Sequence, residues 1–202
     1  MVDTRHDASH IQRGSLVDRS NHYEAAFEGY LQWHRHCYIA VDETRRSFLG
    51  DQRVKSLDFI VPATAGGQWL IDVKGRRYPG GPPERPRRVW ECWSQREDLD
   101  SLRQWAECFG PGYQALLVFL YEIMPHAPPL PPDEELWTWH DRRYVLRAVP
   151  VDDYRLHMRV RSPKWDTVDL PSAVFRRLSR PFHIFVRQPV PAEDAWSDRV
   201  PF

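Results

Sequence analysis

The chain has 202 residues, of which 28 are Lys or Arg and 28 are Asp or Glu, so its formal net charge is zero. Apolar residues make up 42% of it, which is enough for a buried core and excludes a wholly disordered chain. The longest apolar run, residues 115–121, is too short to span a bilayer, and the first residues hold no apolar segment typical of a secretory signal. Cys37, Cys92 and Cys108 form no CxxC motif, so we expect core thiols, no zinc cluster and a reducing cytoplasm.

The neutral net charge conceals a basic middle of the chain. Between Arg45 and Arg88 there are ten basic and four acidic residues, and the rest of the chain carries the compensating negative charge. This distribution is typical of a surface that binds nucleic acid. An arginine-rich solvated loop, or the arginine bias of a GC-rich genome, would give the same distribution.

The first half of the chain predicts a helix, three strands, a second helix and a fourth strand. Residues 1–20 are polar and aperiodic and are expected to form a tail. From Tyr23 the apolar residues recur with a helical period, with Asn21 as the N-cap. A second helix is expected over 97–109, ended by Gly110. Runs of β-forming residues predict strands at 37–41, 57–61, 69–73 and 115–121.

The second half of the chain predicts an extension of the core that residues 21–126 form. Residues 127–135 are rich in proline and are expected to be a stiff connector. Over 136–188 we expect an α+β extension packed on the core. It begins with a hairpin of 136–139 and 144–149, has helices near 152–159 and 171–178, and is followed by a tail over 189–202. The predicted fold class is α/β, with a small mixed sheet flanked by helices in the order α-β-β-β-α-β.

Two aspartates stand inside strand-like apolar runs, where a charge is costly unless it is paired or bound to a metal. If the two strands form an antiparallel hairpin with a symmetric loop, Val61 faces Trp69. Asp58 and Asp72 then stand directly opposite each other on one face, with Cβ atoms about 4.5–5.5 Å apart. A divalent cation between the two carboxylates would remove their repulsion.

Lys74 and Glu24 are the further candidates for this site. Lys74 follows Asp72 by two residues and so projects from the same face, where its ammonium would lie beside a metal-bound water or an attacked phosphate. The alternative for this face is a buried Asp–Lys ion pair without a metal. Glu24 lies in the first turn of the first predicted helix. It is either a third carboxylate reaching the metal or a capping-box partner of Asn21.

This ordered pattern resembles the PD-(D/E)xK nuclease superfamily, which has a restriction-endonuclease-like core. The resemblance covers an acid on an N-terminal helix (Glu24), an Asp on a strand (Asp58), and D-x-K on the next strand (Asp72, Val73, Lys74). It departs from the family at Leu57, which stands where a proline often precedes the first aspartate, and the extension after Pro125 has no counterpart.

The next segment is similar to archaeal Holliday-junction resolvases and Mrr-like nucleases. Residues 94–110 resemble their helix, which a glutamine opens and a glycine closes, and residues 115–119 resemble the strand that follows. Gln95 maps to that glutamine. Resolvase-like relatives are dimers, so a homodimer is an open expectation here, although no strip of the sequence identifies a dimer face.

The resemblance implies hydrolysis of phosphodiester bonds with Mg²⁺, for which Mn²⁺ is a substitute. Asp58, Asp72 and the Val73 carbonyl would hold the metal, with Glu24 in contact directly or through water. Lys74 would orient or deprotonate the attacking water, and Gln95 would place Lys74 or the water. The arginines that follow the site would bind the nucleic-acid backbone: Arg76, Arg77, Arg85, Arg87 and Arg88.

DNA is the favoured substrate, and the same pattern is compatible with branched or linear molecules and with endo- or exonucleolytic cleavage. Two alternatives to a nuclease stay open: a catalytically silent nucleic-acid-binding or assembly module with this fold, and an unrelated α/β protein with an accidental D-x-K. The segment 161–165 is a minor further candidate for DNA contact. Trp105 is expected in the core, and Trp137, Trp139 and Trp165 are expected to anchor the extension on the main domain.

Overall fold

The computed structural model describes residues 21–42, 47–49, 52–132 and 134–186, so both expected tails lie outside the described residues. The helices of this part are α1 His22–Trp33, α2 Arg96–Phe109, α3 Val151–His157 and α4 Ser172–Leu178, with 3₁₀ turns η1 Pro163–Trp165 and η2 Phe182–Phe185. The strands are β1 Ile39–Ala40, β2 Ser47–Leu49, β3 Gln52–Val54, β4 Phe59–Pro62, β5 Gln68–Tyr78, β6 Ser94–Gln95, β7 Tyr113–Ile123, β8 Leu136–Trp139, β9 Arg142–Pro150, β10 Arg159–Ser162, β11 Thr167–Asp169 and β12 Arg180–Pro181. No helix of the described ranges is long and apolar enough to cross a membrane.

Within the described ranges the main sheet has seven strands. Six follow the order β1-β4-β5-β7-β9-β12, and β8 pairs with the first residues of β9. β5 and β7 are parallel along the full length of both strands, and the neighbouring pairs β4–β5 and β7–β9 are antiparallel. The parallel pair is long and rich in Leu, Val, Ile and Phe because helices cover both of its faces. Two smaller sheets are separate, β10-β11-β6 and β2-β3.

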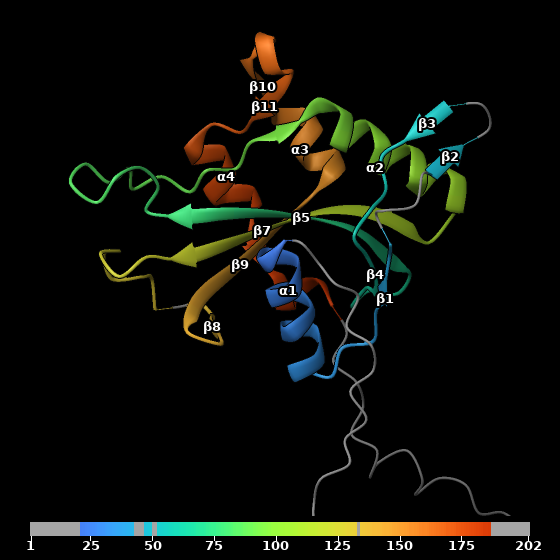
Figure 1. The fold of residues 1–202 in the computed structure, drawn as a ribbon. Helices are drawn as coiled ribbons and strands as arrows, with labels where there is room; N and C mark the ends of the chain where they lie inside the picture. Colours follow the sequence, from blue (N-terminus) through green and yellow to red (C-terminus); the bar gives the residue numbers. More distant parts are fainter. Residues whose placement is uncertain (1–20, 43–46, 50–51, 133, 187–202) are drawn as a thin grey trace, which may run out of the picture.

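Helices cover both faces of the main sheet (Figure 1). On one face, α1 and η2 pack on the sheet through a cluster that includes Phe27, Phe59 and Phe182. On the other face, α2, α3 and α4 pack on the sheet through a second cluster that includes Leu99 and Phe175. The expected α/β class and the order α-β-β-β-α-β are therefore confirmed in α1, β1, β4, β5, α2 and β7, with the β2–β3 hairpin and β6 inserted.

Two glycines allow α1 to lie close to the sheet. A Cβ atom on Gly75 of β5 would lie 2.1 Å from the ring of Tyr23, and one on Gly29 of α1 would lie 2.5 Å from the indole nitrogen of Trp139. Both distances are far below van der Waals contact, so any side chain at either position would push α1 away. The first turn of α1 is thereby fixed against the middle of β5.

The residues after the proline-rich connector do more than pack on the core. β9 pairs with β7 from Glu122↔Tyr144 to Leu116↔Pro150, so residues 136–150 complete the central sheet itself. The expected hairpin forms, but its turn is shorter than predicted. β9 begins at Arg142 rather than at residue 144, and Arg142 lies opposite Trp139, so only residues 140–141 form the turn. Non-local pairing of this kind depends on which strand edge the rest of the fold leaves free. A local sequence pattern does not contain that information.

Several single-residue expectations need correction. Trp137 and Trp139 contact the cluster beneath α1, but Trp165 is 68% exposed and does not anchor the extension. Cys92 is a buried core thiol, whereas Cys37 and Cys108 are exposed. On α2 the apolar stripe is only partly buried, because Phe109 at its end is 43% exposed.

Candidate active site

The candidate site lies where one edge of β5 is left unpaired. β4 pairs with β5 only as far as Phe59↔Ile71, whereas β7 accompanies β5 to its end at Tyr78. From Asp72 onward, β5 has, within the described residues, no strand on its β4 side. Side chains from both faces of the sheet can therefore meet around this open edge.

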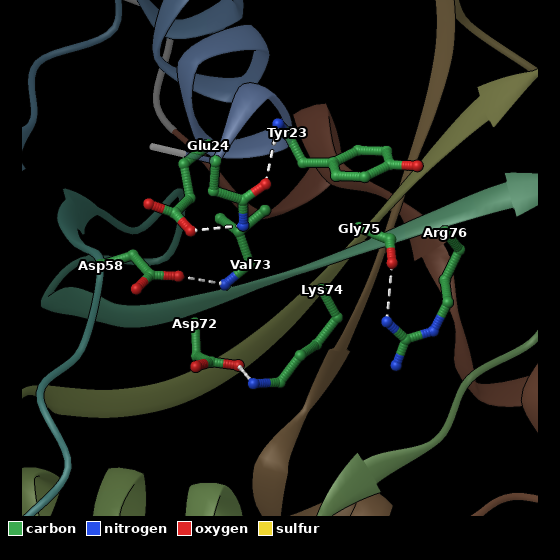
Figure 2. A pocket seen from close by; sticks show the side chains of 9 residues that line it. Tyr23, Glu24, Asp58, Asp72, Val73, Lys74, Gly75 and Arg76 are labelled. Carbon is green, nitrogen blue, oxygen red and sulfur yellow. Dashed lines mark hydrogen bonds and ion pairs between the residues drawn. The ribbon is translucent and has the colours of Figure 1, made fainter. Parts of the chain in front are cut away.

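A cavity of about 410 Å³ follows this edge, and we call it the edge cavity (Figure 2). Its lining comes from the first turn of α1, the residue before β4 and the middle of β5: Asn21, Tyr23, Glu24, Asp58, Asp72, Val73, Lys74, Gly75 and Arg76. The tertiary structure thus brings together four of the five predicted catalytic residues, which come from three separate elements. The fifth, Gln95, is not among them.

Asp58 lies at the unpaired edge of β5 rather than across from Asp72. The expected register is confirmed where β4 and β5 pair, with Val61 opposite Trp69. Pairing then departs from that register, because the Asp58 N–H donates to the Ile71 carbonyl. The buried Asp58 carboxylate accepts a 2.6 Å hydrogen bond from the Val73 N–H. This N–H has no strand partner in the described part of the chain, because β4 begins only after Asp58. The prediction that the two aspartates stand directly opposite each other was therefore wrong, although both line the edge cavity.

Glu24 reaches the edge cavity because α1 begins there. Asn21 caps the helix, since its side chain accepts from the Tyr23 N–H at 3.2 Å, as the sequence predicts. The Asn21 amide also donates to the Glu24 carboxylate at 2.6 Å. Glu24 is thus hydrogen-bonded to the N-cap side chain, whereas a capping box would require a bond to the N-cap backbone, and it also lines the cavity (Figure 2).

Lys74 lies between two carboxylates on the side of the sheet opposite α1 (Figure 2). Its Nζ is 2.6 Å from Asp72 Oδ2 and 2.8 Å from Asp98 Oδ2 at the start of α2. Burial acts to lower the pKa of Lys74, but the charges of Asp72 and Asp98 outweigh it and raise that pKa above its usual value. Lys74 is therefore an ammonium at neutral pH.

Asp98 is a neighbour of Lys74 that the sequence did not reveal. Only 6% of it is exposed, and its carboxylate contacts Lys55 Nζ at 2.7 Å and accepts from Ser94 Oγ at 2.9 Å. Burial alone would raise its pKa, but Lys74 and Lys55 lower it from 3.8 to about 2. Its sequence signal resembles an ordinary acid in the first turn of a helix.

Gln95 does not reach Lys74. It is exposed, and its side-chain carbonyl accepts from Lys55 Nζ at 2.5 Å. Its N–H donates to Asp98 Oδ2 at 3.2 Å. The resemblance implied a glutamine beside the lysine of the D-x-K motif. In the structure Asp98 lies there instead, and Gln95 contacts Asp98 and Lys55 rather than Lys74.

The five predicted arginines fall into two groups. Arg76 lines the edge cavity, donates to the Gly75 and Trp93 carbonyls, and stacks on the Trp93 ring with 4.0 Å from Cζ to the ring centroid. Burial lowers its pKa. The other four are exposed, although Arg77 lies near Glu122 and Arg87 pairs with Glu91: Arg77, Arg85, Arg87 and Arg88.

The donors of the edge cavity suit a hard divalent cation. Carboxylates from Asp58 and Asp72 and a backbone carbonyl at Val73 are oxygen ligands, which Mg²⁺ prefers, and Mg²⁺ commonly uses only one or two carboxylates. Across the described ranges, no three Asp, Glu, His or Cys side chains form a ready-made metal-binding group. The residues fit a magnesium ion bound by two carboxylates and water, and do not fit an all-protein cage.

Comparisons with known proteins give one structural likeness to report. No family model and no curated protein sequence matches the chain. Among solved structures, the chain is similar to Hjc, a Holliday junction resolvase from the archaeal hyperthermophile Archaeoglobus fulgidus, with a TM-score of 0.43 and 13% identity, over 78% of this chain and 92% of that one. At this level the likeness carries nothing about activity, so function rests on the residues of the site.

Proposed function

We propose that this chain is a divalent-metal-dependent nuclease that hydrolyses phosphodiester bonds, with DNA as the favoured substrate. The observation that carries the proposal is the edge cavity, where Asp58, Asp72 and Lys74 meet Glu24 from the opposite face of the sheet. These are the residues of the ordered acid, acid and D-x-K pattern. Acids and a lysine spread over fifty residues would converge on one cavity only rarely without a shared role.

Asp58, Asp72 and the Val73 carbonyl would hold Mg²⁺, with Glu24 facing the ion across the cavity. When bound, the ion supplies charge stabilisation and a more acidic water. The chain contributes the rest. Lys74, as an ammonium, donates to the attacking water or to a phosphate oxygen and offsets negative charge in the transition state. Its proton is held by two neighbouring carboxylates, so it acts as a donor and not as the base.

The pairing of Lys74 also favours the second candidate, a catalytically silent nucleic-acid-binding module. With Asp72 and Asp98 both within ion-pair distance, the lysine and its two neighbours form a buried network that needs no cation. In a silent module, Asp72 would serve Lys74 structurally and the cavity would bind nucleic acid without cleaving it.

A cleavage assay separates the two candidates. Labelled four-way junctions, linear duplex and single-stranded DNA are incubated with Mg²⁺, Mn²⁺, Ca²⁺ or EDTA. We expect cleavage with Mg²⁺ or Mn²⁺ and binding with little turnover in Ca²⁺, because calcium accepts looser coordination and activates water less well. Cleavage in excess EDTA, or its absence with every metal, would overturn the proposal.

Two aspartate substitutions show whether any cleavage belongs to this site. Asp58→Asn and Asp72→Asn should each remove it, while Asp141→Asn, a matched change at an exposed residue of the β8–β9 turn, should cleave like the wild type. If Asp72→Asn binds DNA and cleaves normally, Asp72 is only a structural partner of Lys74, and the cleavage does not belong to this site.

A further inference from the structure

The hairpin of β10 and β11, with the η1 turn at its tip, is attached directly beside the edge cavity, and we call it the hairpin arm (residues 159–169). Its strand β11 pairs with β6, Thr167 opposite Gln95 and Val168 opposite Ser94. These two partners immediately precede α2, whose Asp98 contacts Lys74. In Figure 1 the arm projects beyond α2 and α3, on the face of the sheet opposite α1.

A stack of side chains links the arm to the cavity. Arg76, which lines the cavity, lies over the Trp93 ring. Arg161 of β10 also lies over the Trp93 ring, with 5.3 Å from its Cζ to the ring centroid. Lys74 and Arg76 leave β5 on the same side (Figure 2), so a strand that leaves the cavity past Arg76 reaches Arg161 next.

A second cavity, of about 420 Å³, lies between the arm and residues 87–92. Arg159 and Arg161 of the arm line one side, and Arg87 of the predicted basic segment lines the other. This cavity joins that segment to the arm, two groups of arginines that are separated by more than seventy residues in the sequence.

The cations of the arm differ in whether they are already neutralised. Arg159 pairs with Asp169 at 2.9 Å, and Asp166 pairs with Arg96 at 3.3 Å, which uses both acids of the arm. Arg161 and Lys164 are exposed and, among the described residues, make no ion pair. The arm therefore presents two unneutralised positive charges.

The tip of the arm also presents an aromatic surface. Trp165 is 68% exposed, and Lys164 Nζ lies 5.2 Å from its ring centroid. A large exposed tryptophan on a short turn adds little to the stability of the chain, but its flat face suits an unpaired base. Cations combined with an exposed aromatic ring are the combination that single-stranded nucleic acid requires.

We propose that the hairpin arm binds an unpaired segment of the substrate strand next to the edge cavity. Arg161 and Lys164 contact its phosphates, and Trp165 stacks on one of its bases. The inference rests on the proposed function for its substrate, and it adds a preference for DNA with unpaired nucleotides beside the cleaved bond. A duplex offers phosphates to the arginines but no free base face to Trp165.

Binding without cleavage tests the arm. The full chain is titrated in EDTA against a fluorescein-labelled oligothymidylate of about 15 nucleotides, and separately against a duplex of the same length, with anisotropy as the readout. Trp165→Ala should weaken oligothymidylate binding roughly tenfold, the scale of one lost base stack. It should change duplex binding much less, and Trp165→Tyr should recover most of the loss.

Matched controls are present in the chain. Trp33→Ala removes a tryptophan that is 74% exposed at the end of α1 and should bind like the wild type. The double change Arg161→Ala and Lys164→Ala should reduce the salt slope of single-strand binding by about 1.4, for two lost phosphate contacts. Arg143→Ala with Arg177→Ala, which removes two exposed cations from β9 and α4, should not.

The outcomes separate this inference from the proposed function. If the arm variants bind the oligothymidylate as tightly as their controls, or if the wild type binds neither probe, the arm is not a nucleic-acid contact. That result leaves any metal-dependent cleavage by the wild type standing. If the arm variants lose affinity while no metal supports cleavage, the arm inference holds and the nuclease proposal fails.

Discussion

The edge cavity and the hairpin arm both carry positive charge, but they hold it in opposite ways. In the edge cavity, Lys74 is only partly exposed and lies between Asp72 and Asp98 at hydrogen-bond distance. On the arm, Arg161 and Lys164 are exposed to solvent. In the edge cavity, a change in the shape of one side chain disturbs a connected network of ion pairs. On the hairpin arm, each exposed charge acts nearly independently and is screened by salt. The same residue type should therefore give all-or-none effects in one region and graded effects in the other.

The largest contrast should come from the same substitution at two lysines. Lys74→Arg should lower the cleavage rate by at least about a hundredfold while DNA affinity in Ca²⁺ stays nearly unchanged, because a planar guanidinium cannot occupy the ammonium position between two carboxylates. Lys164→Arg on the arm should cleave like the wild type. Equal rates for the two variants would make Lys74 a general electrostatic residue, and the distinction between the regions would fail.

Gly75→Ala should give the next largest effect. It acts on the side of the cavity formed by α1, across the sheet from Lys74. The added methyl group meets the Tyr23 ring at 2.1 Å, so it should displace the start of α1 and lower stability by about 2–3 kcal/mol. Because Glu24 moves with that turn, cleavage should fall as well. The control is Gly80→Ala, where the nearest atom is 3.6 Å away. Thermal melts and rates that match for the two variants would show that Tyr23 does not position Glu24.

Asp98→Asn tests whether the buried network stabilises the fold. The pKa of Asp98 lies near 2 in the folded chain against an ordinary 3.8, so its charged form should contribute about 2 kcal/mol. A lowered carboxylate pKa gives stability that is present above pH 4 and is lost as the pH falls toward 2. The difference in unfolding free energy between wild type and variant should therefore shrink across that interval.

The control for this change is the neighbouring residue in the same turn of α2. Glu97→Gln removes an acid whose side chain is 65% exposed and whose contact with Lys55 is longer, at 3.7 Å. It should cost well under 1 kcal/mol. Urea titrations at pH 7 and pH 3 measure both variants. A difference for Asp98→Asn that is the same at both pH values would contradict a role for its charge.

The smallest effect per residue should come from the exposed arginines. Changing Arg77, Arg85, Arg87 and Arg88 together to Ala should weaken DNA binding at all sequences alike and flatten its salt dependence, since each lost phosphate contact releases fewer counterions. Arg76 is kept in this variant because it is half-buried and stacks on Trp93. A salt series of binding measurements in Ca²⁺ gives the slope. An unchanged slope would move the nucleic-acid surface away from this segment and toward the arm.

The local patterns were strong enough to predict most helices and strands and the pairing of β4 with β5. A symmetric turn and two β-forming runs fix the register, so Val61 opposite Trp69 follows from sequence spacing alone. They could not reveal that β4 begins only at Phe59, one residue after Asp58, so that Asp58 does not pair with Asp72. This late start of β4 leaves the Val73 N–H for the Asp58 carboxylate and opens the edge on which the cavity forms.

The sequence by itself determined which residues we propose for the chemistry: two acids in apolar strands, a lysine two positions later and an acid at a helix start. Charges in such places are costly, and so they stand out from the apolar pattern without a structure. Only the tertiary structure decided their partners, because Asp98 and the hairpin arm reach the site through contacts between segments distant in the chain. Asp98 and Trp165 resemble an ordinary helix-capping acid and an ordinary aromatic residue until packing buries one and exposes the other.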